Sequence, residues 1–361
     1  MSLGLWRRLF TRPETQPAHD VPHASRAPRP RLVDAPVRTA VPRKTEPATA
    51  PDDQVPVETW LKERLENAIR EVDTQTTGTE RTASFLTLIG RLAGDRDNHL
   101  RRPPAAAQRA MSACRQTDVS AETLVELLEA DPTLTQAILA RANSAYYSRG
   151  GPRCLALKDA ILRQGRQSVH SVLLEQAMNT LVFTGGGPLR GMVDQVWLHM
   201  VRTAPIARDL APVFGVEPEQ AFALGLLHDV GKLAIFDRVA TIRTSQRSEI
   251  EITGPAFSRA LKLLHEPLGG QCALGWDLGD EAARAIAAHH RTSVQSVPSA
   301  PSAPDRLTEV VWLAERVDIA AVRKQPIDLR ALWQSGNLSG DPASAEQILA
   351  NNQALQPLTT V

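Results

Sequence analysis

The sequence predicts an all-α fold, and three observations support this prediction. Of the 361 residues, 42% are hydrophobic but only 4% are aromatic, so the core must consist mainly of Leu, Ala, Val and Ile. Leu and Ala are strong helix formers, whereas strands favour β-branched and aromatic residues. Apolar residues recur at spacings of three and four, which is the period of an amphipathic helix. Helix-starting residues and Gly-Pro breaks divide the chain into segments of helical length.

Residues 1–56 are predicted to be a disordered, Pro-rich N-terminal arm. Ten of the 26 prolines lie between Pro13 and Pro56, and this density disfavours helix and sheet because proline lacks a backbone donor and restricts φ. Ahead of them, one or two turns of amphipathic helix could dock on a partner or a membrane surface. The alternative is a frayed terminus. The apolar residues there are Leu3, Leu5, Trp6, Leu9 and Phe10.

Residues 57–99 are predicted to form a helical extension packed on the main domain. Two apolar stripes with helical spacing occur in this segment, and charged residues separate the apolar positions of the first. The first stripe comprises Trp60, Leu61, Leu65, Ala68, Ile69 and Val72, and the second comprises Phe85, Leu86, Leu88, Ile89 and Leu92.

The main domain is predicted to span residues 100–325, followed by a C-terminal tail at 326–361. Ser120 can cap one helix, and Asp131 can cap the next, where Pro132 takes the first helical position that tolerates proline. A Ser- and Pro-rich loop is expected at 292–304, and only a weak Val/Ile patch near 247–252 resembles a strand. Further helices are expected as a pair within 155–183 and at about 192–212, 217–228, 255–275, 280–290 and 306–323.

Charge and cysteine content narrow the function classes. Lys and Arg (41) nearly balance Asp and Glu (40), and the net charge of +1 provides no long-range field, so no nucleic-acid partner is expected. Three cysteines without a CxxC pair suit a reducing compartment. The sequence has no apolar run of about 18 residues, so no transmembrane segment is predicted. Arginines interrupt the apolar start of the chain, unlike a secretory signal. We therefore expect a cytoplasmic protein.

Several motifs, in order along the chain, resemble the HDOD family (HD-related output domain). This bacterial signalling family is related to the HD and HD-GYP metal-dependent phosphohydrolases. The resemblance implies a multi-helical HD-superfamily domain, and Gln164, where the family usually has leucine, is one departure. The motifs are LVELLEADPTLTQAILARANSAYY at 124–147, LALKDAILRQGRQSV at 155–169, FALGLLHDVGKLAIF at 222–236, AIAAHH at 285–290 and VVWLAERVD at 310–318.

The resemblance also implies a site for one or two divalent transition-metal ions, namely Fe, Mn or Zn. Imidazole and carboxylate groups are the ligands that such ions prefer. Five of the nine histidines match ligand positions of the HD superfamily. The implied ligands are His199 and His228 for one ion, His265, His289 and His290 for the other, Asp229 as a bridge, and Glu315 as the last carboxylate, with Asp318 as a substitute for Glu315.

The adjacent pair His228 and Asp229 requires a particular local structure. Gly231 indicates that the pair lies at a helix end, where neighbouring side chains converge more easily than the roughly 100° per residue of a helix interior allows. Lys232 resembles the lysine that HD phosphodiesterases place near the phosphate. Asp229 and Lys232 are therefore the candidate catalytic residues.

Two departures reduce the resemblance to catalytic relatives. His290 is followed by RTSVQSVPS, whereas cyclic-di-GMP phosphodiesterases of the HD-GYP type carry HHExxDGxGYP at this point. Gln195 stands where a trinuclear site of that type has glutamate. Many HDOD proteins, moreover, are regarded as non-catalytic output modules.

Two functions from different classes are consistent with these motifs. The first is a regulatory output or scaffold protein of signal transduction that binds other signalling proteins. The alternative is a metal-dependent phosphohydrolase or phosphodiesterase acting on a nucleotide or cyclic dinucleotide. A third option is a pocket that binds a nucleotide ligand without cleaving it. Convergence of the five imidazoles would favour a metal site, and scattered rings would favour a purely regulatory module. Trp197, Trp276 and Trp312 are predicted core residues.

Overall fold

The structure is a computed structural model that describes residues 55–78, 85–86, 88–90, 105–116, 118–129, 131–183, 189–246, 254–290 and 303–351. The helices of these residues are connected only by turns and irregular segments, and no strand occurs among them, which confirms the all-α prediction. Almost all of the predicted arm, the Val/Ile patch at 247–252 and nearly all of the 292–304 loop lie outside the described residues.

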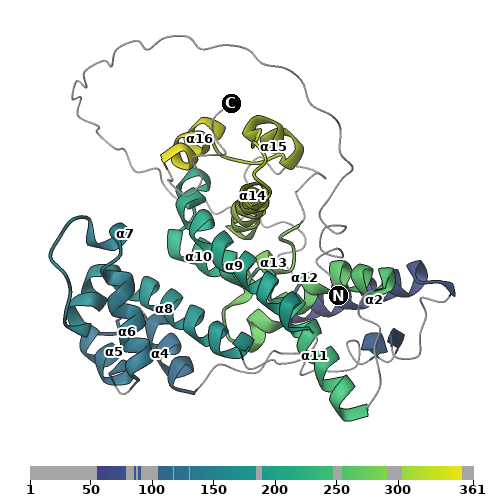
Figure 1. Cartoon of the computed structure of the whole chain (residues 1–361), viewed down its shortest axis with the longest axis horizontal. Coiled ribbons are helices and arrows are strands. Elements are labelled where there is room, and N and C mark those ends of the chain that lie inside the picture. Colours follow the sequence, from purple (N-terminus) through teal and green to yellow (C-terminus); the bar gives the residue numbers. More distant parts are fainter. Residues whose placement is uncertain are drawn as a thin grey trace, which may run out of the picture. The chain divides into compact units, whose positions relative to one another are not determined.

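The first group of helices surrounds a long helix, α8, and contains the first two motifs (Figure 1). The predicted caps are confirmed, since Ser120 accepts from the backbone N–H of Thr123, and Asp131 accepts from Leu134. Gly165 interrupts α8 with φ 76° and ψ 161°, so this element is the expected helical pair. The group comprises α4 (Ala105–Arg115), α5 (Ala121–Leu128), α6 (Pro132–Ala142), α7 (Ala145–Ser148) and α8 (Leu157–Phe183).

The second group of helices contains all the candidate ligands. Helix α9 packs against α10 and α14, while α12 packs against α11 and α13, so side chains from distant sequence segments reach a common interior. The group comprises α9 (Arg190–Leu210), the 3₁₀ helix η3 (Ala211–Phe214), α10 (Pro218–Leu227), α11 (Val230–Gln246), α12 (Pro255–Gly275), α13 (Asp280–Ile286) and α14 (Ala303–Arg323).

A close approach between α11 and α12 explains one glycine of the HDVGK motif. A Cβ atom on Gly231 would lie 1.9 Å from the carbonyl oxygen of His265 and 2.7 Å from the backbone nitrogen of Gly269. Only a residue without a side chain fits there, because these neighbours are backbone atoms that cannot rotate away. Gly231 therefore brings the start of α11 against the turn of α12 that carries His265.

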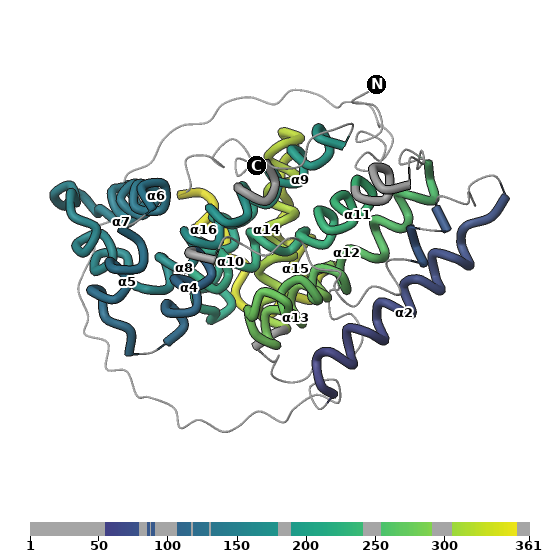
Figure 2. The backbone as a smooth tube through the Cα atoms, turned by 90° about the horizontal axis from the view of Figure 1, so that it is seen from below, coloured from purple at the N-terminus to yellow at the C-terminus, as the bar shows by residue number. Residues whose placement is uncertain are grey.

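Helix α2 (Val57–Gln75) lies along α12 (Figure 2). Leu61 is fully buried, and its Cδ2 atom would lie 2.5 Å from a Cβ on Gly270, so the two helices touch closely. Nη2 of Arg64 donates to the carbonyl oxygen of Ala287, and Arg284 donates to the carbonyl of Val55. The first part of the predicted extension is thus packed on the segment that leads to His289 and His290.

Two further helices form within residues 326–361, for which the sequence predicted only a tail. They are α15 (Leu329–Gly336) and α16 (Pro342–Asn351). The ring of Trp333 stacks on that of Phe214, with centroids 5.6 Å apart, and Leu349 belongs to the same buried cluster. Both helices therefore contribute to the core around α14.

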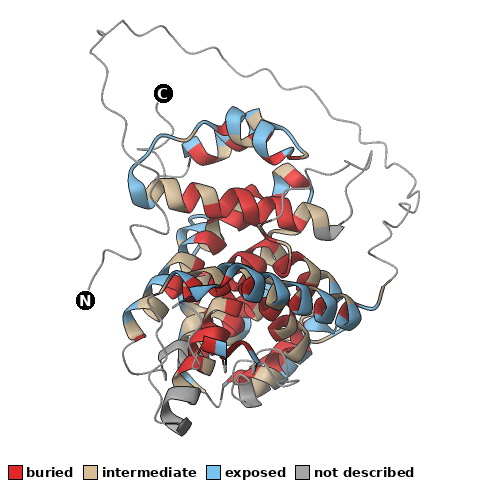
Figure 3. Cartoon of the chain, turned by 90° about the vertical axis from the view of Figure 1, so that its right-hand side faces the viewer, coloured by how far each residue is buried: buried red, intermediate tan, exposed pale blue. Residues whose placement is uncertain are grey.

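Burial follows the expected pattern, since buried residues are concentrated where helices lie against one another (Figure 3). Trp197, Trp276 and Trp312 are 8%, 8% and 4% exposed, which confirms them as core residues. Among the described residues, no helix is both long and apolar enough to cross a membrane.

Candidate metal centre

The His228–Asp229 pair lies at the break between two helices, as the glycine signal predicted. Helix α10 ends at Leu227, and α11 begins at Val230. Within a helix, adjacent side chains diverge by about 100°. At this break both side chains point into the interior, with Nε2 of His228 3.6 Å from Oδ2 of Asp229. Both residues are at most 1% exposed.

Three side chains, His199, His228 and Asp229, form a first group of potential ligand atoms. Nδ1 of His228 lies 2.9 Å from the carbonyl oxygen of Gly225, and Nδ1 of His199 lies 2.7 Å from Oδ2 of Asp318. A neutral imidazole has one N–H, and in both rings an acceptor occupies the Nδ1 side. The two Nε2 atoms consequently face each other at 3.2 Å with lone pairs. A cation near both atoms, or a proton on one, relieves their repulsion.

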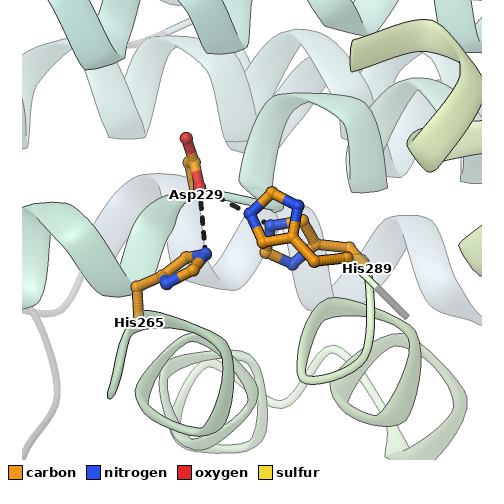
Figure 4. A group of neighbouring side chains, drawn as sticks. Asp229, His265 and His289 are labelled. Atoms are coloured by element: carbon orange, nitrogen blue, oxygen red, sulfur yellow. Dashed lines mark ion pairs between the residues drawn. The ribbon is translucent and has the colours of Figure 1, made fainter. Parts of the chain in front are cut away.

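The second group contains Asp229, His265, His289 and His290. His265 on α12 and His289, which follows the end of α13, each place Nε2 3.6 Å from Oδ1 of Asp229 (Figure 4). Their Nδ1 atoms lie 2.9 Å from the carbonyl of Leu261 and 2.7 Å from that of Ile286. These carbonyls fix the tautomer and turn the Nε2 lone pairs toward Asp229, an arrangement typical of metal-ligating histidines.

The geometry of the second group fits a metal ion better than it fits hydrogen bonding. Oδ1 of Asp229 and Nε2 of His265 and His289 are buried without a hydrogen-bond partner. Such groups each cost about 1–3 kcal/mol when left unsatisfied. Two donor atoms that share one ion at about 2.1 Å and a near-tetrahedral angle lie roughly 3.4 Å apart. The observed 3.6 Å separations are close to this value, so the donor set suits a divalent transition metal.

The protonation states also suit metal binding. Burial lowers the pKa of His228 to about 3, and burial together with Lys232 holds the pKa of His265 well below 6.5. Burial alone would raise the pKa of Asp229, but the Lys232 ammonium and the nearby imidazoles hold it well below 3.8. At neutral pH His228 and His265 are therefore neutral imidazoles and Asp229 is an ionised carboxylate, which are the forms that bind metals.

The two candidate catalytic residues are in direct contact. Nζ of Lys232 lies 2.6 Å from Oδ2 of Asp229, and the lysine side chain is 12% exposed. Lys232 lies in the first turn of α11, three residues after Asp229, and this spacing of nearly one helical turn brings the two side chains together. The ammonium neutralises one carboxylate oxygen, and the other, Oδ1, faces His265 and His289.

Glu315 and Asp318 lie outside both groups of potential ligand atoms. Each carboxylate instead contacts one histidine of these groups. Oε2 of Glu315 is 3.3 Å from Nδ1 of His290. Burial by itself would lower the pKa of His290, but the Glu315 carboxylate raises it. Asp318 contacts His199 and pairs with Arg202, whose Nε lies 2.7 Å from Oδ1. Both carboxylates are thus placed to orient a histidine, whereas the sequence suggested them as ligands.

Arg202 was not among the residues singled out from the sequence. Its spacing of three from His199 puts both on one face of α9, which was the available signal. The spacing alone does not show that Asp318, 116 residues away, lies between them. Gln195, one turn before His199, is exposed.

The comparisons with known proteins agree with this architecture. Residues 100–292 match the family model of the HDOD domain. No curated protein matches the chain. A structure from Shewanella amazonensis SB2B, provisionally named a metal-dependent phosphohydrolase, is 19% identical with a TM-score of 0.53, covering 73% of this chain and 98% of its own. A second structure from that organism, provisionally named a phosphohydrolase, is 21% identical with a TM-score of 0.53, covering 77% and 98%.

An HDOD domain protein of unknown function from Geobacter sulfurreducens is 22% identical, with a TM-score of 0.49, and the match covers 82% of this chain and 88% of that one. The two Shewanella structures show that the helical fold is shared. Since the family model matches more than half of the sequence, the chain belongs to the HDOD family.

Proposed function

We propose that this protein is a bacterial regulatory protein of signal transduction whose HDOD domain retains an HD-type metal centre. The observation that carries the proposal is the set of buried lone pairs around Asp229, made by imidazoles from separate segments of the chain. Burial of so many polar atoms without partners is unfavourable unless a cation binds them. Nδ1 of His228, His265 and His289 each faces a backbone carbonyl oxygen, which leaves Nε2 as the ring nitrogen that a metal would use.

The proposed ligands divide into two sets that share Asp229. His199 and His228 would hold one ion, and His265, His289 and His290 the other. Asp318 and Glu315 would orient His199 and His290 through the Nδ1 atoms that they contact. A divalent ion at such a centre polarises phosphoryl oxygens and makes water more acidic. Lys232 would keep Asp229 ionised and could contact an anionic ligand.

Regulation rather than turnover is proposed because elements of catalytic relatives are absent from the sequence. His289 and His290 are followed by RTSVQSVPS instead of the remainder of the HHExxDGxGYP motif. The residue at the position of a third-metal ligand is Gln195, which is exposed. The centre would then serve as a structural or sensory element, and signalling proteins would bind according to whether it holds metal.

The metal content of protein purified without oxygen tests the first half of this proposal. We expect at least one Fe, Mn or Zn ion per chain in the wild type and less than about a tenth as much in His228→Ala. His170→Gln is the matched control, because His170 lies on α8 in the other group of helices and outside both ligand groups. Wild-type protein with less than a tenth of an ion per chain would refute a retained centre.

The second candidate function is a metal-dependent phosphohydrolase, favoured by the contact between Lys232 and Asp229. The provisional names of the Shewanella structures agree with it. Cyclic dinucleotides, (p)ppGpp and nucleoside phosphates should be assayed with Mn or Fe added. The regulatory proposal predicts no turnover of any of them. Turnover that disappears in Asp229→Ala would replace it by the hydrolytic function.

A further inference from the structure

Helix α2 bridges the two segments that supply the histidines of the second ligand group. It packs mainly against α12, which carries His265, and it also contacts α13, which ends shortly before His289 and His290. Its buried residues follow one another at spacings of four, four and seven, so a single face of the helix is held against the domain. These residues are Val57, Leu61, Leu65 and Val72.

The three helices meet closely at Gly270 of α12. A Cβ atom on Gly270 would lie 2.5 Å from Cδ2 of Leu61, which is fully buried. The same atom would lie 2.9 Å from the carbonyl oxygen of Ala283 on α13 and 2.9 Å from Cβ of Ala287. Displacement of α2 would therefore remove a packing partner from α12 and from α13 at the same point.

Two arginines connect α2 and α13 in opposite directions. Nη2 of Arg64 on α2 donates to the carbonyl oxygen of Ala287, the C-cap of α13. Nη2 of Arg284 on α13 donates to the carbonyl oxygen of Val55, just before α2. The Trp60 ring contacts both guanidiniums, with its centroid 4.8 Å from that of Arg64 and 5.1 Å from that of Arg284. These directional contacts fix the position of α2 along α13.

The contact with Ala287 acts on the turn that carries two of the proposed ligands. Ala287 follows Ile286, whose carbonyl oxygen lies 2.7 Å from Nδ1 of His289. At the other end of the turn, the backbone N–H of His290 donates to Oε1 of Glu266 on α12 at 3.1 Å. Helix α2 thus holds the start of a four-residue turn whose end is held by α12. Both contacts restrict the backbone that positions the two imidazoles.

The second ligand group is open to solvent on the side of α2. The side chain of His290 is 33% exposed, whereas those of His265 and His289 are 1% and 0% exposed. A cavity of about 430 Å³, lined mostly by residues of α2, α12 and α14, has His290 in its wall. An ion or a chelator would therefore approach this group beside α2.

We propose that docking of α2 is coupled to occupancy of the second metal site, with Arg64 as a positioning residue for His289 and His290. This inference rests on the proposed metal centre and concerns its regulation. Docked α2 fixes the turn and forms one wall of the approach to His290, so it should raise the affinity for the ion. Coupling of two equilibria is reciprocal, so the ion must stabilise docked α2 by the same factor.

The coupling would give a signalling partner access to the metal centre. Helix α2 precedes the region matched by the family model, and its exposed face carries charged residues such as Glu63, Glu66 and Arg70. A protein that binds α2 in its undocked position would lower the affinity for the ion, and loss of the ion would favour such binding.

Chelator competition on the full chain tests the role of Arg64. Arg64→Gln should weaken the binding of one ion about tenfold. Residues that orient ligands usually contribute 10- to 100-fold, and the lower value applies because Arg64 acts through the backbone of the turn. Arg64→Lys keeps a donor and should restore part of the affinity. Arg70→Gln is the matched control, because Arg70 is an exposed arginine of α2 that binds Asn67 of the same helix.

Amide hydrogen exchange of the wild type tests the reciprocal effect without a substitution. Addition of Mn or Zn to EDTA-treated protein should slow the exchange of α2 about tenfold. Helix α5, which lies in the other group of helices, is the internal control and should change less. This measurement decides the question even when Arg64→Gln does not fold. Equal slowing of α2 and α5 would indicate only global stabilisation and would overturn the coupling.

The same experiments separate this inference from the proposed metal centre. Wild-type protein that binds metal, together with unchanged affinity in Arg64→Gln, refutes the coupling and keeps the centre. A loss of affinity that Arg64→Lys does not restore, without slower exchange of α2 on metal binding, refutes it as well. Wild-type protein that binds no metal refutes the centre itself and the coupling with it.

Discussion

Asp318 accepts a hydrogen bond from Nδ1 of His199 at 2.7 Å, although 119 residues separate them in sequence. Arg202 binds the same carboxylate through two nitrogens, at 2.7 and 3.2 Å. The carboxylate therefore holds the imidazole of His199 in the orientation that directs Nε2 at His228. This relationship gives Asp318 a positioning role in the candidate centre.

Removal of this carboxylate is expected to weaken metal binding. Asp318→Asn should lower the affinity for the ion on His199 and His228 about 10- to 100-fold, the usual effect of changing a residue that orients a ligand. Competition with a chelator of known affinity measures this change. Glu309→Gln, a buried glutamate on the same helix that binds Ser339 instead, should leave the affinity unchanged. An unchanged affinity in Asp318→Asn would contradict the positioning role.

The close contact of α11 and α12 predicts an effect on stability. Gly231→Ala should lower the free energy of unfolding by about 1–3 kcal/mol or more, because its Cβ would overlap the His265 carbonyl. It should also reduce metal content, since the overlap displaces His265 from Asp229. Gly191→Ala on α9 meets no atom within 4 Å and should be neutral or stabilising by up to about 1 kcal/mol. Urea unfolding of both variants provides the comparison, and equal stabilities would refute the expected clash.

The buried histidines predict that metal-free protein loses stability in acid. Burial lowers the pKa of His228 from 6.5 to about 3, so protons bind the unfolded chain more readily than the folded one. The resulting stabilisation is fully present above about pH 6.5 and is lost as the pH falls from there toward 3. Urea unfolding of EDTA-treated protein should show that the free energy of unfolding declines over this pH interval. The decline should be shallower in His228→Gln, and identical slopes would contradict the assignment to His228.

The C-terminal helices predict a further stability effect that leaves the site chemistry intact. Trp333→Ala should lower the free energy of unfolding by about 3–5 kcal/mol, because it removes a buried ring that stacks on Phe214. Metal content per folded chain should not change, since neither residue belongs to a ligand group. Gln334→Ala, at an exposed neighbouring position, should cost less than about 0.5 kcal/mol. A loss below about 1 kcal/mol in Trp333→Ala would show that α15 adds little to the core.

Much of the fold could be predicted because its signals are local. A helix cap acts within three residues, so Ser120 and Asp131 indicated helix starts that the structure confirms. Apolar spacing indicated the helices that contain the candidate ligands to within a few residues at their starts. The helices α15 and α16 were not predicted, since they are only 8 and 10 residues long and their burial depends on η3 and α14. The predicted domain boundaries at 56, 99 and 325 stay predictions.

The sequence by itself determined the all-α class, the family, and which imidazoles and which Asp–Lys pair are available, because these depend on residue type and order. Only the tertiary structure decided which atoms meet. It placed Glu315 and Asp318 behind histidines, required Gly231 for a backbone contact, and laid α2 along a cavity beside His290. These relationships arise from the packing of helices far apart in sequence, and no local pattern encodes the distance between them.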